Sequence, residues 1–462
     1  MGPGRPDPDQ AVAGRWRGRH RVGPPVSAVG RSRLLRLPPV LPHERVPDRA
    51  RGCSGRLAAV TATGAPAPSS THRLTAALFA GGVATFAELY AVQAVLPALA
   101  AEFSLSESTA SLAVSVATGA LALSVLPWAF VGDRVGRARA MRWAAVAAAV
   151  CATALPFAPS FGVLLALRAV SGVALGALPA LAMAHLVARA EPARVAAIGG
   201  LYIAGTTIGG LSGRVVTGAV AAGWGWRWGV AVTAVLVAVA VAVFVVLSRG
   251  DDRRQPRSRA TPSGGPPVTT TLGAGARLRA AFTDRTVAVF YAQAFLLMGG
   301  FVTIYNLLGF RLLDEPYRLP ASVVSLLFLT YLVGTVGSSG VGRAVGRFGR
   351  RRVLVAAGFA MAGGVALTLA PSLWLIIAGL VVATFAFFPA HAIAASWAGE
   401  RIPGARSQVA ATYSLAYYAG SSLVGFAGAA VYDRGGWTGA MAVVITGCVV
   451  AASIAAIGAP RR

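Results

Sequence analysis

Twelve apolar runs, each long enough to cross a bilayer, recur from residue 74 to the C-terminus and constrain the fold most strongly. A helix needs about 20 apolar residues to span the roughly 30 Å hydrocarbon core. With soft edges, the runs cover residues 74–100, 109–131, 140–158, 161–187, 195–222, 228–247, 286–312, 321–342, 353–370, 372–398, 407–431 and 438–458. Since lipid offers the backbone no hydrogen-bond partners, each run is predicted to be helical. The sequence therefore predicts an all-α polytopic membrane protein with twelve transmembrane helices.

The composition supports this class of protein. Of the 462 residues 56% are hydrophobic and only 13% are charged, whereas a soluble domain is about 25% charged. The net charge of +26 comes entirely from arginine, since the chain has no lysine. Most of these arginines lie in the N-terminal tail or in short loops between apolar runs, which indicates membrane topology and no nucleic-acid partner. The three cysteines, Cys53, Cys151 and Cys448, are far apart and indicate neither a disulfide framework nor a metal site.

Polar segments divide the chain into four parts. Residues 1–70 form an Arg/Pro-rich tail without sustained periodicity, for which disorder is the physical expectation. This tail is a start-site artefact, a basic arm lying on anionic lipid, or a functional arm. Residues 71–247 and 286–462 each hold six apolar runs, and residues 248–285 form a Pro/Ser/Arg-rich linker between them.

Arginine counting predicts the orientation. Loops on one side of the predicted membrane hold 21 arginines, and loops on the other side hold four: Arg227, Arg311, Arg318 and Arg434. Cytoplasmic loops of membrane proteins carry the excess of basic residues. We therefore expect a protein of the cell membrane with the arginine-rich loops and both termini in the cytoplasm.

Two loops reveal an internal repeat. The second loop contains "GDRVGRARAM" from Gly132, and the eighth contains "GRFGRRRVL" from Gly346. An offset of 213 residues sets Asp133 against Gly346 and also sets Gln93 against Asn306. Two six-helix halves related by such a repeat are typical of secondary transporters.

These loops resemble the major facilitator superfamily, whose second loop carries Gly-x-x-x-Asp-Arg-x-Gly-Arg-Arg. The first copy matches at Asp133, Arg134, Gly136, Arg137 and Arg139, and the second at Gly342, Arg347, Gly349, Arg350 and Arg351. The resemblance implies the major facilitator fold and an acid–arginine pair that locks the cytoplasmic side when the protein is open outward. Because Gly346 replaces the acid, we expect the first copy to carry most of the gating. A plain topogenic arginine cluster is the alternative.

Further elements resemble the drug/proton antiporter branch of that superfamily. In the fourth run Leu164, Arg168 and Gly172 match, and in the first run the spacing of Glu88, Gln93 and Pro97 is similar to Asp-x-x-x-x-Asn-x-x-x-Pro. The fifth run resembles the element Gly-x-x-x-Gly-Pro-x-x-Gly-Gly at Gly205, Gly209 and Gly213, with Gly210 in place of proline and Arg214 in place of the last glycine. The resemblance implies efflux of a sugar, a drug or a similar small molecule in exchange for protons.

The three glycines of the fifth run, Gly205, Gly209 and Gly213, recur every four residues and so share one face of a helix. Small residues in such a stripe let another helix approach closely. We expect a tight seam against the eighth run that prevents proton leakage, with simple packing as the alternative.

Glu88 is a carboxylate inside an apolar run. At 1.5 Å per residue it lies about 21 Å along the first span, and Arg168 lies roughly 10 Å from the outer end of the fourth, so their depths agree. A charge near the bilayer centre costs about 2.5–3.5 kcal/mol unless it is paired or faces water. Because an arginine keeps its proton, Glu88 is the predicted proton carrier and Arg168 the residue that tunes it. A structural Glu–Arg or Glu–Gln bond, or a substrate contact without proton traffic, are the alternatives.

Other polar residues in the runs complete the set of candidates. Gln93 and Asn306 are predicted to line the substrate cavity, and Tyr413 and Tyr417 lie one turn apart and present an aromatic stripe to a ligand or to the core. The lone histidines, His185 and His391, are interpreted as structural. No phosphate-binding loop, metal cluster or nucleophile–base pair is visible, so neither enzymatic chemistry nor a cofactor is expected.

These observations predict a monomeric secondary transporter that exports a small organic molecule, drug-like, sugar or metabolite, by proton antiport and alternating access. The lipid bilayer, protons and a small-molecule substrate are its expected partners. A proton-independent facilitator or importer, in which Glu88 binds substrate, is the first alternative. A non-transporting membrane receptor or scaffold is the second.

Overall fold

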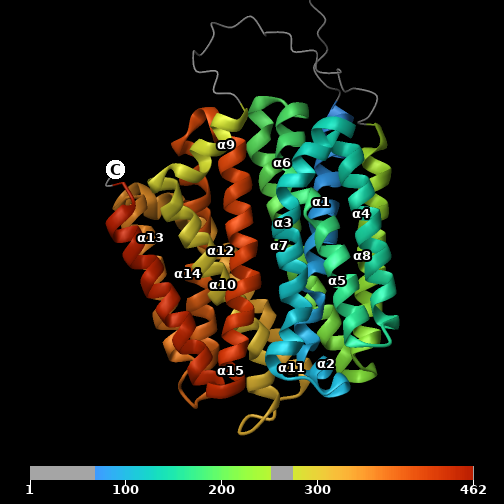
Figure 1. Cartoon of the computed structure of the whole chain (residues 1–462), viewed down its shortest axis with the longest axis vertical. Helices are drawn as coiled ribbons and strands as arrows, with labels where there is room; N and C mark the ends of the chain where they lie inside the picture. Colours follow the sequence, from blue (N-terminus) through green and yellow to red (C-terminus); the bar gives the residue numbers. More distant parts are fainter. Residues whose placement is uncertain (1–67, 251–273, 461–462) are drawn as a thin grey trace, which may run out of the picture. The chain divides into compact units, whose positions relative to one another are not determined.

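A computed structural model describes residues 68–250 and 274–460. The tail predicted for residues 1–70 lies almost wholly outside these ranges, as do Cys53 and much of the linker. Within the described ranges every regular element is an α-helix or a short 3-10 helix. Figure 1 shows the blue-to-green helices and the yellow-to-red helices as two groups of nearly parallel rods.

The N-terminal half contains ten helical elements. They are α1 (Pro68–Ala91), η1 (Val92–Val95), α2 (Leu96–Phe103), α3 (Glu107–Val135), α4 (Arg137–Ala154), η2 (Leu155–Phe157), α5 (Phe161–Leu175), α6 (Ala177–Arg189), α7 (Pro192–Trp224) and α8 (Trp226–Ser248). The C-terminal half follows with α9 (Ala274–Thr283), α10 (Arg285–Leu313), α11 (Ala321–Leu326), η4 (Leu327–Thr330), α12 (Tyr331–Phe348), α13 (Arg350–Leu367), α14 (Leu373–Arg401), η5 (Pro403–Ala405) and α15 (Arg406–Gly458).

The predicted spans correspond to these helices. Among the described residues, ten helical stretches are long and apolar enough to cross a membrane. The 18-residue α13 begins with three consecutive arginines and matches a further predicted span. The 53-residue α15 contains two predicted spans joined at Gly436, which has a φ of 57°. The all-α, twelve-span membrane fold is therefore confirmed.

Three membrane-spanning segments are interrupted. Pro97 lacks the N–H that would bond the Gln93 carbonyl, and the chain forms η1 just before it. Pro179 has the same effect on the Leu175 carbonyl, and α5 gives way to α6 at Gly176. In η4 the Thr330 hydroxyl bonds the Leu327 carbonyl at 2.7 Å. Such interruptions leave backbone polar groups open to other partners inside the membrane.

The glycine stripe of α7 packs against α1. A Cβ added at Gly205, Gly209 or Gly213 would lie 2.3–2.5 Å from a carbonyl oxygen of α1, that of Phe79, Val83 or Ala87. The two backbones are therefore in contact over three successive turns. The prediction that the eighth span covers this stripe is therefore wrong. The eighth span begins with α11, which contacts α7 farther along the helix, where Gly218 packs on Ser325. Periodicity defined the face correctly, but it carries no information on which helix covers that face.

One short helix departs from the expected linker. α9 lies inside the segment predicted as an irregular connection, and Ala281 in it is fully buried. The hydroxyl of Tyr291 on α10 donates to the Ala281 carbonyl at 3.1 Å. Asp284 then caps α10, since its carboxylate accepts from the backbone N–H groups of Thr286 and Val287 at 2.9 Å.

Candidate functional site

Glu88 and Arg168 form a buried ion pair inside the N-terminal half. Glu88 on α1 is 4% exposed and Arg168 on α5 is fully buried, and the Arg168 Nη1 atom lies 3.6 Å from Glu88 Oε1. The sequence prediction that these two charges lie at one depth agrees with this distance. The second carboxylate oxygen, Oε2, has no hydrogen-bond partner among the described residues.

Backbone carbonyls, rather than the carboxylate, hold the Arg168 guanidinium. Its Nε donates to the Ala113 carbonyl at 2.8 Å, and its Nη1 and Nη2 donate to the carbonyls of Glu88 and Leu89 at 3.1 and 2.5 Å. One side chain thereby joins α5 to both α3 and α1. These acceptors belong to the main chain, so they are present whether Glu88 is charged or neutral.

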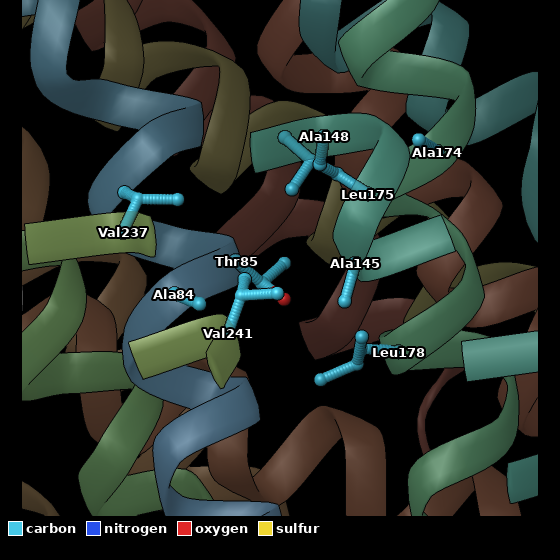
Figure 2. A pocket seen from close by; sticks show the side chains of 9 residues that line it. All are labelled: Ala84, Thr85, Ala145, Ala148, Ala174, Leu175, Leu178, Val237 and Val241. Carbon is cyan, nitrogen blue, oxygen red and sulfur yellow. The ribbon is translucent and has the colours of Figure 1, made fainter. Parts of the chain in front are cut away.

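Ser171 on α5 and Cys151 on α4 also lie near the Glu88 carboxylate, and both belong to the N-terminal half. One helical turn away, a cavity of about 10 Å³ lies between α1, α4, α5, α6 and α8 (Figure 2). That volume matches about one water molecule. Figure 2 shows that Thr85 supplies the only polar side chain among the labelled lining residues.

A second buried guanidinium, Arg214 on α7, lies at the boundary between the halves. Its side chain is 2% exposed. Its Nε donates to Gln93 Oε1 at 2.5 Å, and Gln93 Nε2 donates to Asn306 Oδ1 at 2.6 Å. Gln93 and Asn306 are the two residues that the 213-residue repeat sets against each other, and in the structure their side chains form a direct hydrogen bond. Both side chains are buried, at 3% and 1% exposure.

Aromatic rings surround the Arg214 guanidinium. Its central carbon lies 4.2 Å from the ring centroid of Tyr90, 4.6 Å from that of Tyr331 and 5.5 Å from that of Phe328. A cation over such rings is stabilised by the ring quadrupole. Tyr90 comes from the N-terminal half and the other two rings from the C-terminal half, where Phe328 is part of η4.

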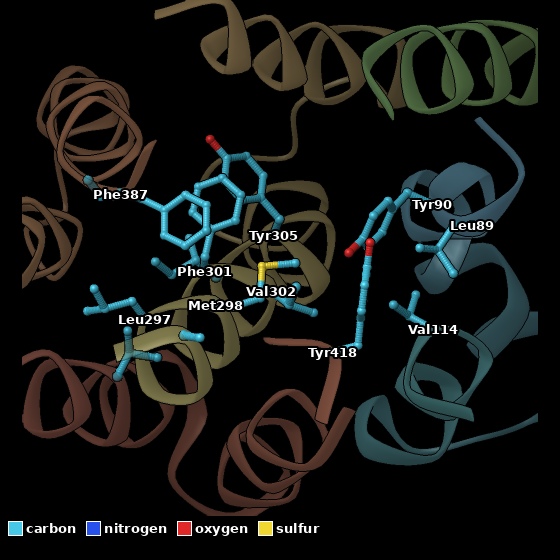
Figure 3. Close-up of a cluster of buried hydrophobic side chains, with 14 of the residues drawn as sticks. Leu89, Tyr90, Val114, Leu297, Met298, Phe301, Val302, Tyr305, Phe387 and Tyr418 are labelled. Atoms are coloured by element: carbon cyan, nitrogen blue, oxygen red, sulfur yellow. The ribbon is translucent and has the colours of Figure 1, made fainter. Parts of the chain in front are cut away.

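The predicted aromatic stripe of α15, Tyr413 and Tyr417, lies near His391. The Tyr413 hydroxyl lies 3.0 Å from His391 Nδ1, and the Tyr417 ring centroid lies 4.6 Å from that of the imidazole. Next to this stripe, Tyr418 reaches across toward Tyr90 of the N-terminal half (Figure 3). Tyr413 is 5% exposed and Tyr417 is half-buried.

The two repeat-related loops share a backbone turn but differ in their ion pairs. Gly136 and Gly349, 213 residues apart, have φ values of 96° and 85°, which a side chain would strain. In the first loop Arg137 lies 3.4 Å from Asp133 and donates to the Ala184 carbonyl of α6 at 2.9 Å.

In the second loop, Arg350 pairs with Glu400 of α14. Arg351 donates to the Ala456 carbonyl of α15, and Arg347 lies over the Phe348 ring. The second motif has Gly346 where the first has Asp133, and Glu400 of α14 supplies the carboxylate that pairs with its arginine.

Sequence reasoning missed two of these charged groups. Arg214 was noted only as a departure from a glycine element, although a charge in an apolar run is itself a signal. Glu400 lies 50 residues from its partner, so no local pattern links them. Within residues 68–250 and 274–460, no group of three or more His, Cys, Asp and Glu side chains could hold a metal ion.

The chain is similar to known membrane transporters. Residues 78–339 match the Major Facilitator Superfamily. The chain is 34% identical to the uncharacterized MFS-type transporter YybF of Bacillus subtilis (strain 168), over 81% of this chain and 90% of YybF. It is 36% identical to the inner membrane transport protein YnfM of Escherichia coli (strain K12), over 82% and 88% of the two chains.

Solved structures share the fold. A bacterial homolog of the human lysosomal transporter Spinster, in an inward-facing and occupied conformation, gives a TM-score of 0.67 at 15% identity, over 84% of this chain and 96% of that one. The nucleoside transporter NupG gives a TM-score of 0.64 at 15% identity, over 83% and 97%.

Proposed function

Because the chain belongs to the major facilitator superfamily, we propose that it exports a small organic molecule across the cell membrane by proton antiport. The observation that carries this proposal is the ion pair of Glu88 and Arg168, buried within membrane-spanning helices. The substrate moves by alternating access, in which the two halves rock about a site near mid-membrane.

Glu88 is the proposed proton carrier. Its separation of 3.6 Å from Arg168 is an ion pair without a direct hydrogen bond, and one carboxylate oxygen has no partner. Arg168 keeps its three carbonyl acceptors whether Glu88 is charged or neutral. Protonation therefore changes the net charge of the pair without removing the contacts that join α1, α3 and α5.

The described neighbours of the carboxylate favour this role over substrate binding. Arg168, Ser171 and Cys151 all belong to the N-terminal half, whereas transporter substrates bind between the repeats. Gln93, Asn306, Tyr413 and Tyr417 are proposed for the substrate path, since Gln93 and Asn306 meet across the boundary between the halves.

The arginine-rich end is proposed to face the cytoplasm, together with both termini. Side-chain contacts between the halves include Ser108 with Asp433 at the opposite end and Ser115 with Ser422 near mid-span. Pro97 of α2 also packs on Gly309 of α10. These contacts support a state that is closed toward the outside.

The cytoplasmic gate is proposed to comprise the two repeat-related loops. Asp133, Arg134, Gly136 and Arg137 form the first part of it. Arg347, Gly349 and Arg350 form the second part, which Glu400 completes as the missing acid.

Everted membrane vesicles with an acidic lumen test the proposal. We expect transported compounds to dissipate the imposed pH gradient in wild-type vesicles and not in Glu88→Gln vesicles. Glu102→Gln is the matched control, because Glu102 also pairs with an arginine, Arg227, but lies at the end of α2. Compound flux that ignores the pH gradient, or an unchanged response in Glu88→Gln, would contradict proton antiport and favour a facilitator.

A further inference from the structure

We propose that Arg214 is the anion-binding residue of the substrate site, so that the exported molecule carries a carboxylate or phosphate group. The inference deepens the proposed function and rests on it. It names the chemical class of the substrate, which neither the family nor the relatives define.

The first argument is the uncompensated charge of Arg214. The buried Arg168 has Glu88 at 3.6 Å. Arg214 is 2% exposed, yet no carboxylate within the described parts of the chain forms an ion pair with it. A buried charge without a counter-ion is costly. The three aromatic rings lower this cost but do not neutralise the charge.

The second argument is the unused hydrogen-bonding capacity of the guanidinium. Nε donates to Gln93 and Nη1 to the Gly210 carbonyl at 2.6 Å. Among the described groups, Nη2 has no acceptor. An oxyanion is the group that a planar guanidinium binds most strongly.

The third argument is a set of buried donors without partners in the same region. The Asn306 Nδ2 atom has none among the described residues, and the buried hydroxyls of Tyr90 and Ser421 have no partner there other than each other. Ser421 neighbours Tyr90, and one turn further along α15 a Cβ at Gly425 would lie 3.8 Å from Asn306 Nδ2. Figure 3 shows Tyr90 pointing from the N-terminal half toward the C-terminal half. An oxyanion accepts hydrogen bonds from all of these groups.

The fourth argument is the backbone around the site. α7 contacts both η1 and η4, the two 3-10 interruptions of the first and eighth spans. Interrupted helices near mid-membrane mark binding sites in secondary transporters. Arg214 bonds Gln93 of η1 and lies over Phe328 of η4, so its side chain links the two interruptions.

The aromatic surroundings define the rest of the molecule. Tyr90, Tyr331 and Phe328 provide apolar faces around a single cation. One guanidinium in an apolar setting suits one anionic group attached to an apolar or aromatic body, since a second anionic group would have no buried counter-ion there. A neutral sugar would leave Arg214 uncompensated.

Matched ligand pairs test the proposal on the purified full-length protein. The thermal unfolding midpoint is measured with benzoate against benzamide and with phenyl phosphate against phenol. Because a ligand that binds only the folded state raises its stability, we expect benzoate or phenyl phosphate to raise the midpoint by several degrees and the neutral partners not to. Equal shifts within both pairs, or no shift with either anion, would overturn the proposal.

Point variants test whether Arg214 is the residue that causes the rise in the unfolding midpoint with anions. Arg214→Gln should weaken anion binding about tenfold or more, which equals about 1.4 kcal/mol. Arg311→Gln is the matched control. Arg311 also lies over a tyrosine ring, that of Tyr317 at 5.0 Å, but it belongs to the last turn of α10 and, among the described residues, forms no hydrogen bond with Gln93 or Arg214. An anion response that survives in Arg214→Gln refutes the assignment.

Gln93→Glu covers the case in which Arg214→Gln does not fold. This substitution sets an internal carboxylate 2.5 Å from Arg214 Nε and supplies the missing counter-ion. We expect the ligand-free protein to unfold at a higher temperature and to lose the anion response. If Arg214 served only to join helices, the anion response of Gln93→Glu would equal that of wild type, which would sink the proposal.

Flux measurements separate this inference from the proposed function. If the vesicles exchange protons for cationic or neutral compounds only, proton antiport stands and the anion site is wrong. If anions bind and no compound affects the pH gradient, the anion site stands and proton antiport is wrong.

Discussion

The two halves use equivalent positions for opposite chemistry. In the N-terminal half, Glu88 pairs with Arg168 within the helices. The repeat offset of 213 places Phe301 at the equivalent position of the C-terminal half. There Phe301 stacks on Phe387, with ring centroids 4.2 Å apart, and Tyr305 adjoins the cluster (Figure 3).

This contrast suggests a division of labour between two copies of one unit. The N-terminal half holds a buried ion pair whose acid we propose as the proton carrier, and the C-terminal half holds packed aromatic rings at the equivalent position. Tyr305 illustrates the latter, because its buried hydroxyl lies 2.6 Å from Thr330 and 2.7 Å from Thr384 and so ties α10 to η4 and α14.

The largest expected effect comes from removing the cation of the N-terminal half. Arg168→Met leaves Glu88 buried without a counter-ion and removes the guanidinium donor from three backbone carbonyls. Breaking a buried pair in this way costs about 3–5 kcal/mol. We expect a large drop in the thermal unfolding midpoint, whereas Glu88→Gln should lower it less, because Arg168 then lacks a counter-ion but keeps its three carbonyl acceptors. Equal drops in both variants would show that the carboxylate, not the main chain, holds the guanidinium.

A smaller effect is expected at the α1–α7 seam. Gly209→Val would bring its Cβ to 2.3 Å from the Val83 carbonyl oxygen, and overpacking of this kind costs about 1–3 kcal/mol. Gly200→Val on the same helix is the control, because nothing lies within 4 Å of its added Cβ. Unfolding midpoints that fall equally in both variants would show a general intolerance of α7 to valine rather than a seam.

The smallest effect on stability is expected at the loop ion pairs. Asp133→Asn and Glu400→Gln remove exposed partners of Arg137 and Arg350, and such pairs contribute about 0–1 kcal/mol. We therefore expect near-wild-type unfolding midpoints together with slower transport in the vesicle assay. Wild-type flux in both variants would leave these loops with a topological role only.

Hydropathy predicted the spans well because membrane insertion depends on length and apolarity alone. Spacing also predicted the equal depths of Glu88 and Arg168 and identified Gln93 and Asn306 as repeat-related cavity candidates, but it did not predict that these two side chains bond each other. The prediction of which helix covers the glycine stripe was wrong, and the pairing of Glu400 with Arg350 was missed. Both depend on packing between segments distant in sequence. Arg214 was overlooked since its role emerges only when η1, η4 and α7 lie together.

The backbone contact between α1 and α7 over three turns has a consequence for motion. We expect two helices packed backbone to backbone to move as one body, so Gln93, just beyond α1 in η1, should move together with Arg214. If the halves part as proposed, the bond between the Gln93 and Asn306 amides must open, as must the contacts of Ser108 with Asp433 and of Ser115 with Ser422. In that motion we expect Tyr331 and Phe328 to move away from the guanidinium, so that its affinity for the proposed anionic substrate changes with the tilt of the halves.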